Sequence, residues 1–287
     1  MGEIIDKAFL SDIYDANNNI KEIFKANFDE LAKDFESSSI ANIGRIMAVF
    51  CLRTEFISEA IYYLCKMANI YSANILFRSL IEHFLKQQYI FFRYAIEQNE
   101  KVCDEYYKYY GNYEYIHYIN VLKKNNEILE SRELNDNELK FLNDIVSEIK
   151  KNSEFEIMKK CYKKFQYIEI LKYIYGNLKK VEQEKVEQEN IPLLKLIIPE
   201  YCRLSSFVHA GPQAELQLYK YMEKDNLIYS LENVAETSLY MRAGILSTTF
   251  LIGSSINDKY IEISREIIKA AELKNRQNKN ELNSTSK

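Results

Sequence analysis

A histidine near the end of an expected helix is the first residue of this chain that points to chemistry. Tyr201, Ser205 and His209 are spaced i, i+4 and i+8 in the run YCRLSSFVHAGP, so a helix places them along one face. Free carbonyls and the helix dipole favour a cation where the helix stops before Gly211-Pro212. His209 can therefore change its charge near neutral pH. It either transfers protons in a reaction or caps a helix carbonyl.

A second polar stripe shows the same spacing. Asn74, Arg78 and Glu82 share one helix face within the apolar stretch NILFRSLIEHFL. A charge buried in such a helix needs a partner, and Arg78 and Glu82 can pair with each other. The pair is either a structural ion pair that fixes helix register or part of a functional site.

Arginine and histidine also occur together at short spacing. Arg203 precedes His209 with five residues between them, and Arg78 precedes His83 with four between. A guanidinium stabilises extra negative charge on phosphorus, and an imidazole moves a proton to or from an attacking or leaving oxygen. Whether Arg203 or Arg78 works with His209 stays open at this point.

Two motifs in the chain resemble a known group of helical proteins. Arg followed by four to six residues and His, in a helical chain, resembles the HEPN superfamily (higher eukaryotes and prokaryotes nucleotide-binding). More narrowly, NILFRSLIEHFL and YCRLSSFVHAGP are similar to an uncharacterised bacterial family that pairs an A-R-S-L-x-E helix with a Y-x-x-L-S-x-x-x-H helix. The recurring positions of that family correspond to Arg78, Glu82, Tyr201, Ser205 and His209, and Arg203 is at a variable position. We predict Arg78, Glu82 and His209 as catalytic residues. The predicted binding or supporting residues are Asn74, Tyr201, Arg203, Ser205 and Ser206.

The same resemblance implies a function. It predicts an RNA-directed protein, a ribonuclease or toxin that needs no metal or other cofactor, works as a homodimer and takes part in antiphage defence. Two alternatives use the same helical scaffold without catalysis. One is a sensor of a nucleotide or small ligand. The other is a regulatory subunit that binds a protein partner in a defence or toxin–antitoxin system.

The composition predicts an all-α fold. Seven Gly and three Pro in 287 residues are few, which argues against the many tight turns of an all-β protein. Apolar residues recur three or four apart along most of the chain, as in amphipathic helices. The sequence therefore predicts a bundle of long antiparallel helices.

One domain, 1–272, is expected to hold this bundle. An N-terminal helix, 1–36, would pack on a core bundle, 40–256, and the charged repeat VEQEKVEQEN marks a possible insertion at 178–191. The polar tail, 273–287, is predicted to be disordered.

The location of the protein is predicted to be cytoplasmic. The five Cys form no C-x-x-C pair, and the first residues lack the pattern of a secretory signal. The apolar segment 238–256 carries Arg242 and several hydroxyls, so a buried core helix is favoured over a membrane span.

Two stretches in the middle of the chain resemble nucleic-acid-binding surfaces in composition. Residues 150–180 hold nine Lys against three Glu, and residues 104–119 are rich in tyrosine. The simpler interpretations are a solvated helix face and partly buried tyrosine rings. Glu114 and His117 have a spacing used in di-iron proteins, but no second such pair occurs, so no metal site is predicted.

Overall fold

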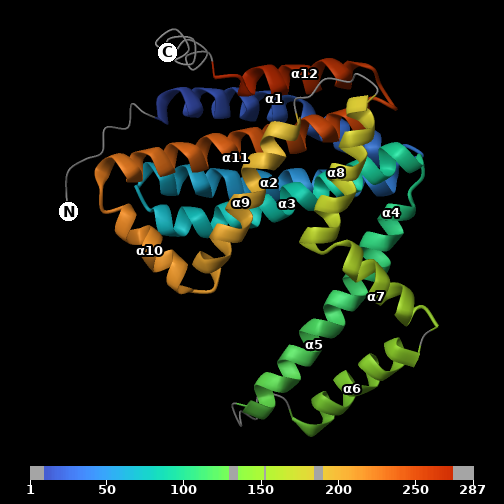
Figure 1. Cartoon of the computed structure of the whole chain (residues 1–287). Coiled ribbons are helices and arrows are strands. Elements are labelled where there is room, and N and C mark those ends of the chain that lie inside the picture. The colour runs from blue at the N-terminus through green and yellow to red at the C-terminus, as the bar shows by residue number, and fades with distance from the viewer. Residues whose placement is uncertain (1–9, 129–134, 152, 184–189, 274–287) are drawn as a thin grey trace. The chain divides into compact units, whose positions relative to one another are not determined.

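The chain folds entirely into helices where its structure is described. A computed structural model describes residues 10–128, 135–151, 153–183 and 190–273 (Figure 1). Every regular element in these ranges is a helix, which confirms the predicted all-α class. The tail predicted to be disordered lies outside the described residues, apart from Leu273 at its start.

The chain divides into two compact units. Unit 1 comprises residues 1–91 and 177–287, and unit 2 comprises residues 92–176. The chain passes from unit 1 to unit 2 within α3 (Ile70–Glu97) and returns within α8 (Tyr167–Gln183). This differs from the single domain expected over 1–272, because residues 92–176 build a core of their own. The centre of the insertion expected at 178–191 lies outside the described residues.

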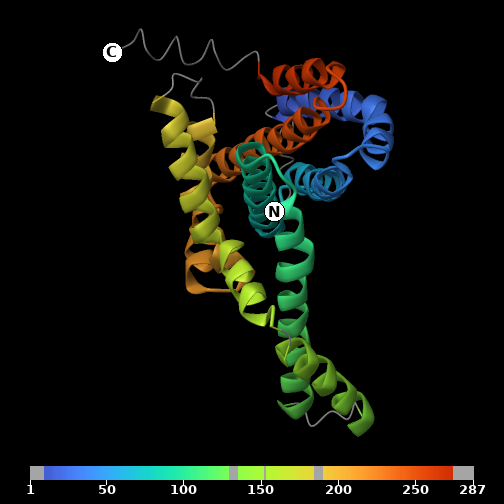
Figure 2. The same cartoon turned by 90° about the vertical axis from the view of Figure 1, so that its right-hand side faces the viewer.

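Unit 1 is built around one long helix, α11 (Lys224–Gly253). Figures 1 and 2 show α1 and α12 side by side against α11, with α2 also packed on it. One face of α1 (Ser11–Glu36) packs on this core, since its residues Ile20, Leu31 and Phe35 are buried. Besides most of α3 and the end of α8, the other helices of unit 1 are α1, α2 (Ala41–Lys66), α9 (Asn190–Val208), α10 (Pro212–Lys220) and α12 (Lys259–Ala271).

The apolar segment 238–256 lies mostly within α11 and is a core helix, as predicted. Its side chains are buried almost all round, from Leu239 to Ile252. In the described ranges, no helix combines the length and the apolar character that a bilayer crossing requires.

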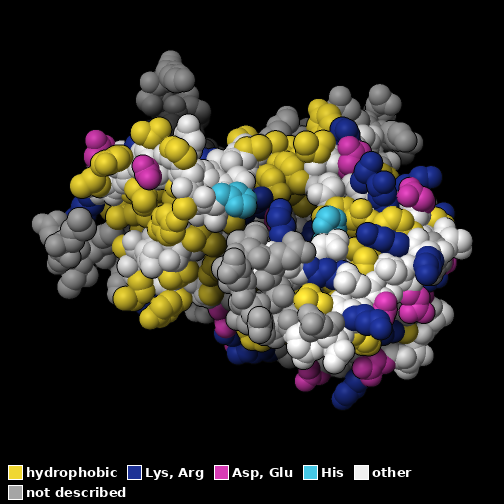
Figure 3. All heavy atoms as spheres, turned by 90° about the horizontal axis from the view of Figure 1, so that it is seen from below, with side chains coloured by type: hydrophobic (Ala, Val, Ile, Leu, Met, Phe, Trp, Pro, Cys, Tyr) yellow, Lys and Arg dark blue, Asp and Glu magenta, His cyan; other side chains and the backbone are white. Residues whose placement is uncertain are grey.

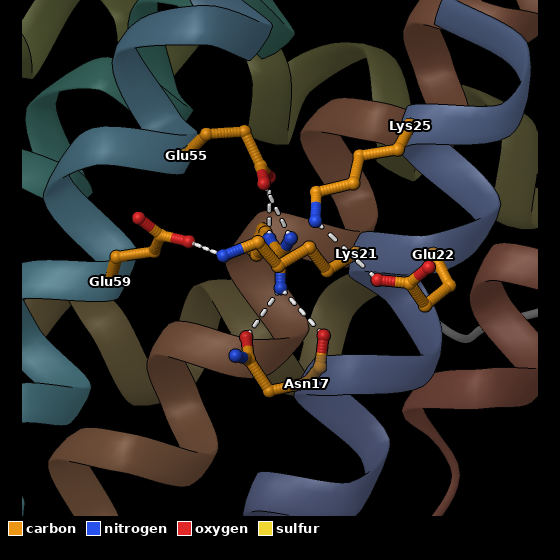
Figure 4. Close-up of polar contacts among 7 residues, drawn as sticks. Asn17, Lys21, Glu22, Lys25, Glu55 and Glu59 are labelled. Carbon is orange, nitrogen blue, oxygen red and sulfur yellow. Dashed lines mark hydrogen bonds and ion pairs between the residues drawn. The ribbon is translucent and has the colours of Figure 1, made fainter.

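A buried arginine ties three helices of unit 1 together (Figure 4). Arg242 on α11 is 1% exposed and binds both carboxylate oxygens of Glu55 on α2 at 2.6 Å. Its third nitrogen donates to the backbone oxygen of Asn17 on α1 at 3.0 Å and to the Asn17 side chain. The bidentate pair and the amide oxygens together compensate the desolvation of this guanidinium.

Around this arginine lie weaker pairs at the surface. Figure 4 shows Lys21 reaching Glu59 and Lys25 reaching Glu22, and the side chains of all four residues are at least 32% exposed. Solvent-exposed pairs of this kind contribute little to stability.

Close packing between α1 and α2 requires glycine at position 44. A Cβ on Gly44 would overlap the ring of Phe35, which is itself buried. We expect Gly44→Ala to lower the free energy of unfolding by about 2 kcal/mol, because overpacking outweighs the better helix propensity of alanine. Gly176→Ala in α8 is the control, since nothing lies within 4 Å of its Cβ position. Urea denaturation followed by circular dichroism measures both, and equal effects would contradict the packing explanation.

Unit 2 has a small core of its own. Its buried centre is formed by Ile116, Ile119 and Val146, with Leu142, Ile145, Ile149 and Phe155 partly buried around them. Besides the ends of α3 and α8, its elements are α4 (Lys101–Asp104), a π-helical segment (Glu105–Tyr110), α5 (Gly111–Ile128), α6 (Asp136–Lys151) and α7 (Phe155–Lys164).

A buried carboxylate holds the start of unit 2 together. Glu105, 5% exposed at its side chain, accepts from Arg93 at 3.0 Å and from Lys164 at 2.8 Å. Burial alone would raise the pKa of Glu105, but the hydrogen bonds from Lys164 and Arg93 bring it below its usual value. The carboxylate therefore stays charged at neutral pH, and the stability it contributes is lost as the pH falls through this lowered pKa.

Candidate active site

The two polar stripes predicted from the sequence meet where α3 packs against α9. Tyr71 on α3 donates to the backbone oxygen of Phe207 on α9 at 3.2 Å, and the guanidinium of Arg78 lies 3.6 Å from the centre of the Tyr201 ring. Residue numbers rise along α3 as they fall along α9 between these contacts. The two helices are therefore antiparallel.

Arg78 is held from two sides. It forms an ion pair with Glu82, one turn further along α3, and its guanidinium stacks on the Tyr201 ring. The Tyr201 hydroxyl also donates to Glu82 at 3.2 Å. Burial and the Glu82 carboxylate raise the pKa of Tyr201, against the effect of Arg78, so this phenol keeps its proton at neutral pH. The three side chains form a closed group, and Arg78 is fixed in orientation with 12% of its side chain exposed.

Unpaired polar atoms lie next to this group. The Nε atom of Arg78 is buried without a hydrogen-bond partner, and so are both amide atoms of Asn74, which is 0% exposed. Asn74 sits one helical turn before Arg78. Buried polar groups normally have a partner, either in the protein or in a bound molecule. The α3 stripe therefore retains hydrogen-bonding capacity beyond the Arg78–Glu82 pair.

His209 lies apart from Arg78 within one chain. It follows the last residue of α9, and its side chain is exposed. Eight residues separate it from Tyr201, which corresponds to about 12 Å along a helix. Tyr201 contacts Arg78 directly, so His209 lies about 12 Å along the helix from the residue on which Arg78 stacks. No hydrogen bond or ion pair of the His209 imidazole is found among the described residues.

The way in which α9 ends differs in detail from the expectation that the helix stops before Gly211-Pro212. The residue with positive φ is Ala210, at 49°, and the Gly211 N–H returns to the Ser206 carbonyl at 2.8 Å. Pro212 begins α10, where a missing N–H costs nothing. Ser206 is structural here, because its hydroxyl accepts from the Ala214 N–H at 2.9 Å.

Arg203 points away from the Arg78 group. It pairs with Glu200 and donates to the Tyr221 hydroxyl at 3.1 Å, which links α9 to the end of α10. The sequence left open which arginine works with His209. Both arginines are ion-paired, and 25% of the Arg203 side chain and 12% of the Arg78 side chain are exposed. Ser205, on the face between Tyr201 and His209, is partly buried.

Pro199 is placed differently from its expected position at a helix start. It lies inside α9, which begins at Asn190. A proline there removes one hydrogen bond of the helix and crowds the preceding turn. The helix nevertheless continues through Pro199 to Val208, and Ile197 just before the proline is buried.

One family model matches the chain, over residues 45–228. This is more than half of the 287 residues. The chain belongs to DUF5677, a family of unknown function. The DUF5677 region includes α3, unit 2 and α9, so Arg78, Tyr201 and His209 lie inside it, whereas Arg242 lies beyond its end. No curated protein and no solved structure matches this chain.

Two other histidines of the DUF5677 region have different surroundings. His83 is partly buried, its Nδ1 lies 2.9 Å from the Ser79 carbonyl oxygen, and burial lowers its pKa. It is therefore a neutral core histidine, and it does not complete a site with Arg78. His117 in unit 2 stacks on Tyr162 with a 5.2 Å separation of ring centres. Within the described ranges, no three His, Cys, Asp or Glu side chains are grouped to hold a metal ion.

Proposed function

We propose that this DUF5677 protein is an RNA-directed, HEPN-like protein that cleaves RNA phosphodiester bonds without a metal ion. The resemblance of its two motifs supplies the reaction class. The observation that carries the proposal is the fixed guanidinium of Arg78, held by Glu82 and stacked on Tyr201. A pre-oriented donor of this kind stabilises charge that develops on phosphorus without reorganising during the reaction.

His209 supplies proton transfer in this proposal. The imidazole takes the proton from the 2′-hydroxyl, whose oxygen then forms a bond to phosphorus. The bond from phosphorus to the 5′-oxygen breaks, and a protonated imidazole gives that oxygen a proton. The products are a 2′,3′-cyclic phosphate and a 5′-hydroxyl. The exposed position of His209 leaves it accessible to a strand of RNA.

We place the reacting groups on two copies of the chain. Tyr201, on which Arg78 stacks, and His209 of the same copy are about 12 Å apart along the helix axis. A twofold dimer brings the same surface of both copies together, so that Arg78 of one copy can face His209 of the other. The homodimer expected from the resemblance would then complete the site.

Cleavage of labelled RNA in EDTA tests this function. The wild type is expected to yield 2′,3′-cyclic phosphate ends, and Arg78→Ala and His209→Ala are expected to yield none above background. Arg265→Ala is the matched control, because Arg265 pairs with Glu262 on the exposed face of α12. Expression of the wild type, but not of either site variant, is expected to arrest growth if the protein is a toxin. Cleavage that survives both site substitutions would refute the proposal.

A second candidate function is a non-cleaving sensor of a nucleotide or small ligand. The buried, unpaired atoms of Asn74 and Arg78 favour it, because a bound molecule can supply their partners. Calorimetric titration with nucleotides separates the two candidates. Binding that Asn74→Ala abolishes, in a protein that cuts no RNA, would favour the sensor.

A further inference from the structure

Unit 2 carries a surface whose chemistry matches single-stranded nucleic acid. We infer that α5 and α7 bind a single-stranded segment of RNA, with lysines on its phosphates and an exposed histidine ring against a base. This inference rests on the proposed function, since it names the form of RNA that the protein takes. It concerns residues of unit 2 that the Arg78 site does not use.

The lysines of α7 are the first part of this surface. Lys159, Lys160, Lys163 and Lys164 occupy four of the last six positions of the helix and are exposed. Lys164 pairs with Glu105, but in the described part of the chain the other three have no ion pair or hydrogen bond. Figure 3 shows Lys and Arg side chains recurring over the visible face of unit 2, with Asp and Glu side chains among them.

These charges repel one another in the free protein. Lys159 and Lys163 are spaced i, i+4, as are Lys160 and Lys164, and like charges at this spacing destabilise a helix. From residue 150 to residue 176 the chain has seven Lys against three Glu, a net charge of +4. Two of those three, Glu154 and Glu169, are already paired with Lys108 and Lys172. Phosphate groups along the lysines would relieve the repulsion.

Aromatic rings lie beside the lysines. Tyr162, between Lys159 and Lys163 on α7, stacks with His117 of α5 at 5.2 Å and an interplanar angle of 25°. The rings of Tyr113 and Tyr110 pack on Tyr162 at 4.8 and 5.7 Å. His117 is at the exposed end of this stack. A base can therefore continue the stack on His117, as bases do on the aromatic platforms of single-strand-binding proteins.

The tyrosines of this unit divide into two groups. Tyr110 is buried, as the simpler interpretation of the tyrosine-rich stretch predicts. Tyr107, Tyr115 and Tyr118 are 46%, 47% and 57% exposed. Tyr115 and Tyr118 lie on α5 with His117, whereas Tyr107 lies in the π-helical segment before it. The exposed rings on α5 offer further area for bases.

Binding of a fluorescent 2′-O-methyl oligonucleotide tests the inference. This probe lacks the 2′-hydroxyl, so its binding can be measured by anisotropy whether or not the protein cleaves RNA. The full chain is expected to bind the single strand and to bind the same sequence more weakly as a duplex. Each phosphate contact contributes about 0.7 to the slope of log affinity against log salt. Lys159→Ala/Lys163→Ala should therefore reduce that slope by about 1.4.

The variants separate the two kinds of contact. His117→Ala is expected to weaken binding about tenfold while leaving the salt slope unchanged, because stacking releases no counterions. Lys33→Ala/Lys269→Ala removes two exposed lysines of unit 1 and should leave binding as in the wild type. Tighter binding of the duplex, or equal weakening by both lysine pairs, would overturn the inference.

Failure of the proposed function gives a different result. In the Arg78→Ala/His209→Ala background, Lys159→Ala/Lys163→Ala should still reduce the salt slope by about 1.4, because these lysines lie in unit 2. If the protein binds the single strand but does not cleave RNA, this inference stands and the proposed ribonuclease function fails. If the protein cleaves RNA but substitutions in α7 and at His117 leave oligonucleotide binding unchanged, the proposed ribonuclease stands and this inference fails.

Discussion

Arg78→Ala will slow RNA cleavage by about 10²- to 10³-fold, the loss found when one pre-oriented donor to a transition state is removed. The guanidinium is the cation that Glu82 and Tyr201 jointly orient, and alanine leaves that position without charge. Single-turnover kinetics with saturating enzyme measure the chemical step directly. The effect should appear in the rate at saturation, because the interaction strengthens in the transition state.

Two further variants identify which property of Arg78 matters. Arg78→Lys keeps the charge but loses the planar fork that stacks on Tyr201, so its rate should fall between those of the wild type and Arg78→Ala. Tyr201→Phe keeps the ring and loses only the hydroxyl bonded to Glu82, so its rate should fall less than tenfold. Equal rates for Arg78→Ala and the wild type, with folding intact by circular dichroism, would remove Arg78 from the mechanism.

Glu55→Ala will lower the free energy of unfolding by about 3–5 kcal/mol, because it leaves Arg242 charged and buried without its carboxylate. Arg242 is 1% exposed and donates two of its hydrogen bonds to the carboxylate of Glu55. Asn17 alone cannot neutralise the guanidinium. Urea denaturation followed by circular dichroism measures the change.

The control for this prediction lies one turn away on α2. Glu59→Ala removes a carboxylate whose pair with Lys21 is solvent-exposed, so it should cost less than about 1 kcal/mol. Replacing both buried partners, as Glu55→Leu/Arg242→Met, should recover most of the lost free energy of unfolding, because no buried charge is then left without a partner. Equal decreases in the free energy of unfolding for Glu55→Ala and Glu59→Ala would contradict a stabilising role of the buried Arg242–Glu55 pair.

Much of the Arg78 group follows from helical spacing. Asn74, Arg78 and Glu82 were expected on one face of α3, and the structure places the Arg78–Glu82 pair there. The meeting of Arg78 with Tyr201 depends on α3 packing antiparallel to α9. Residues 119 apart in the chain come together in the bond between Tyr201 and Glu82, and periodicity within one helix carries no information on such a contact.

Helical periodicity also does not predict the division into two units or the Arg242 network, because both depend on contacts between helices. Helical periodicity runs through α3 without interruption, although the chain passes from unit 1 to unit 2 between Phe91 and Phe92. Arg242 within an apolar helix was a visible signal of a buried partner. Its partner, Glu55, is 187 residues away in a helix with several other acidic and basic residues. Choosing among them requires the packing of α2 on α11.

Mixing two inactive variants tests most directly whether Arg78 and His209 act on the same phosphodiester from different copies. Arg78→Ala and His209→Ala, each inactive alone, are unfolded together, refolded at equal concentration and assayed for RNA cleavage in EDTA. Half of the dimers then contain one chain of each kind, and each of these has one of its two sites intact. We predict recovery of about a quarter of the wild-type activity. A mixture as inactive as its components, beside an active wild type refolded in the same way, would contradict a site shared between two copies.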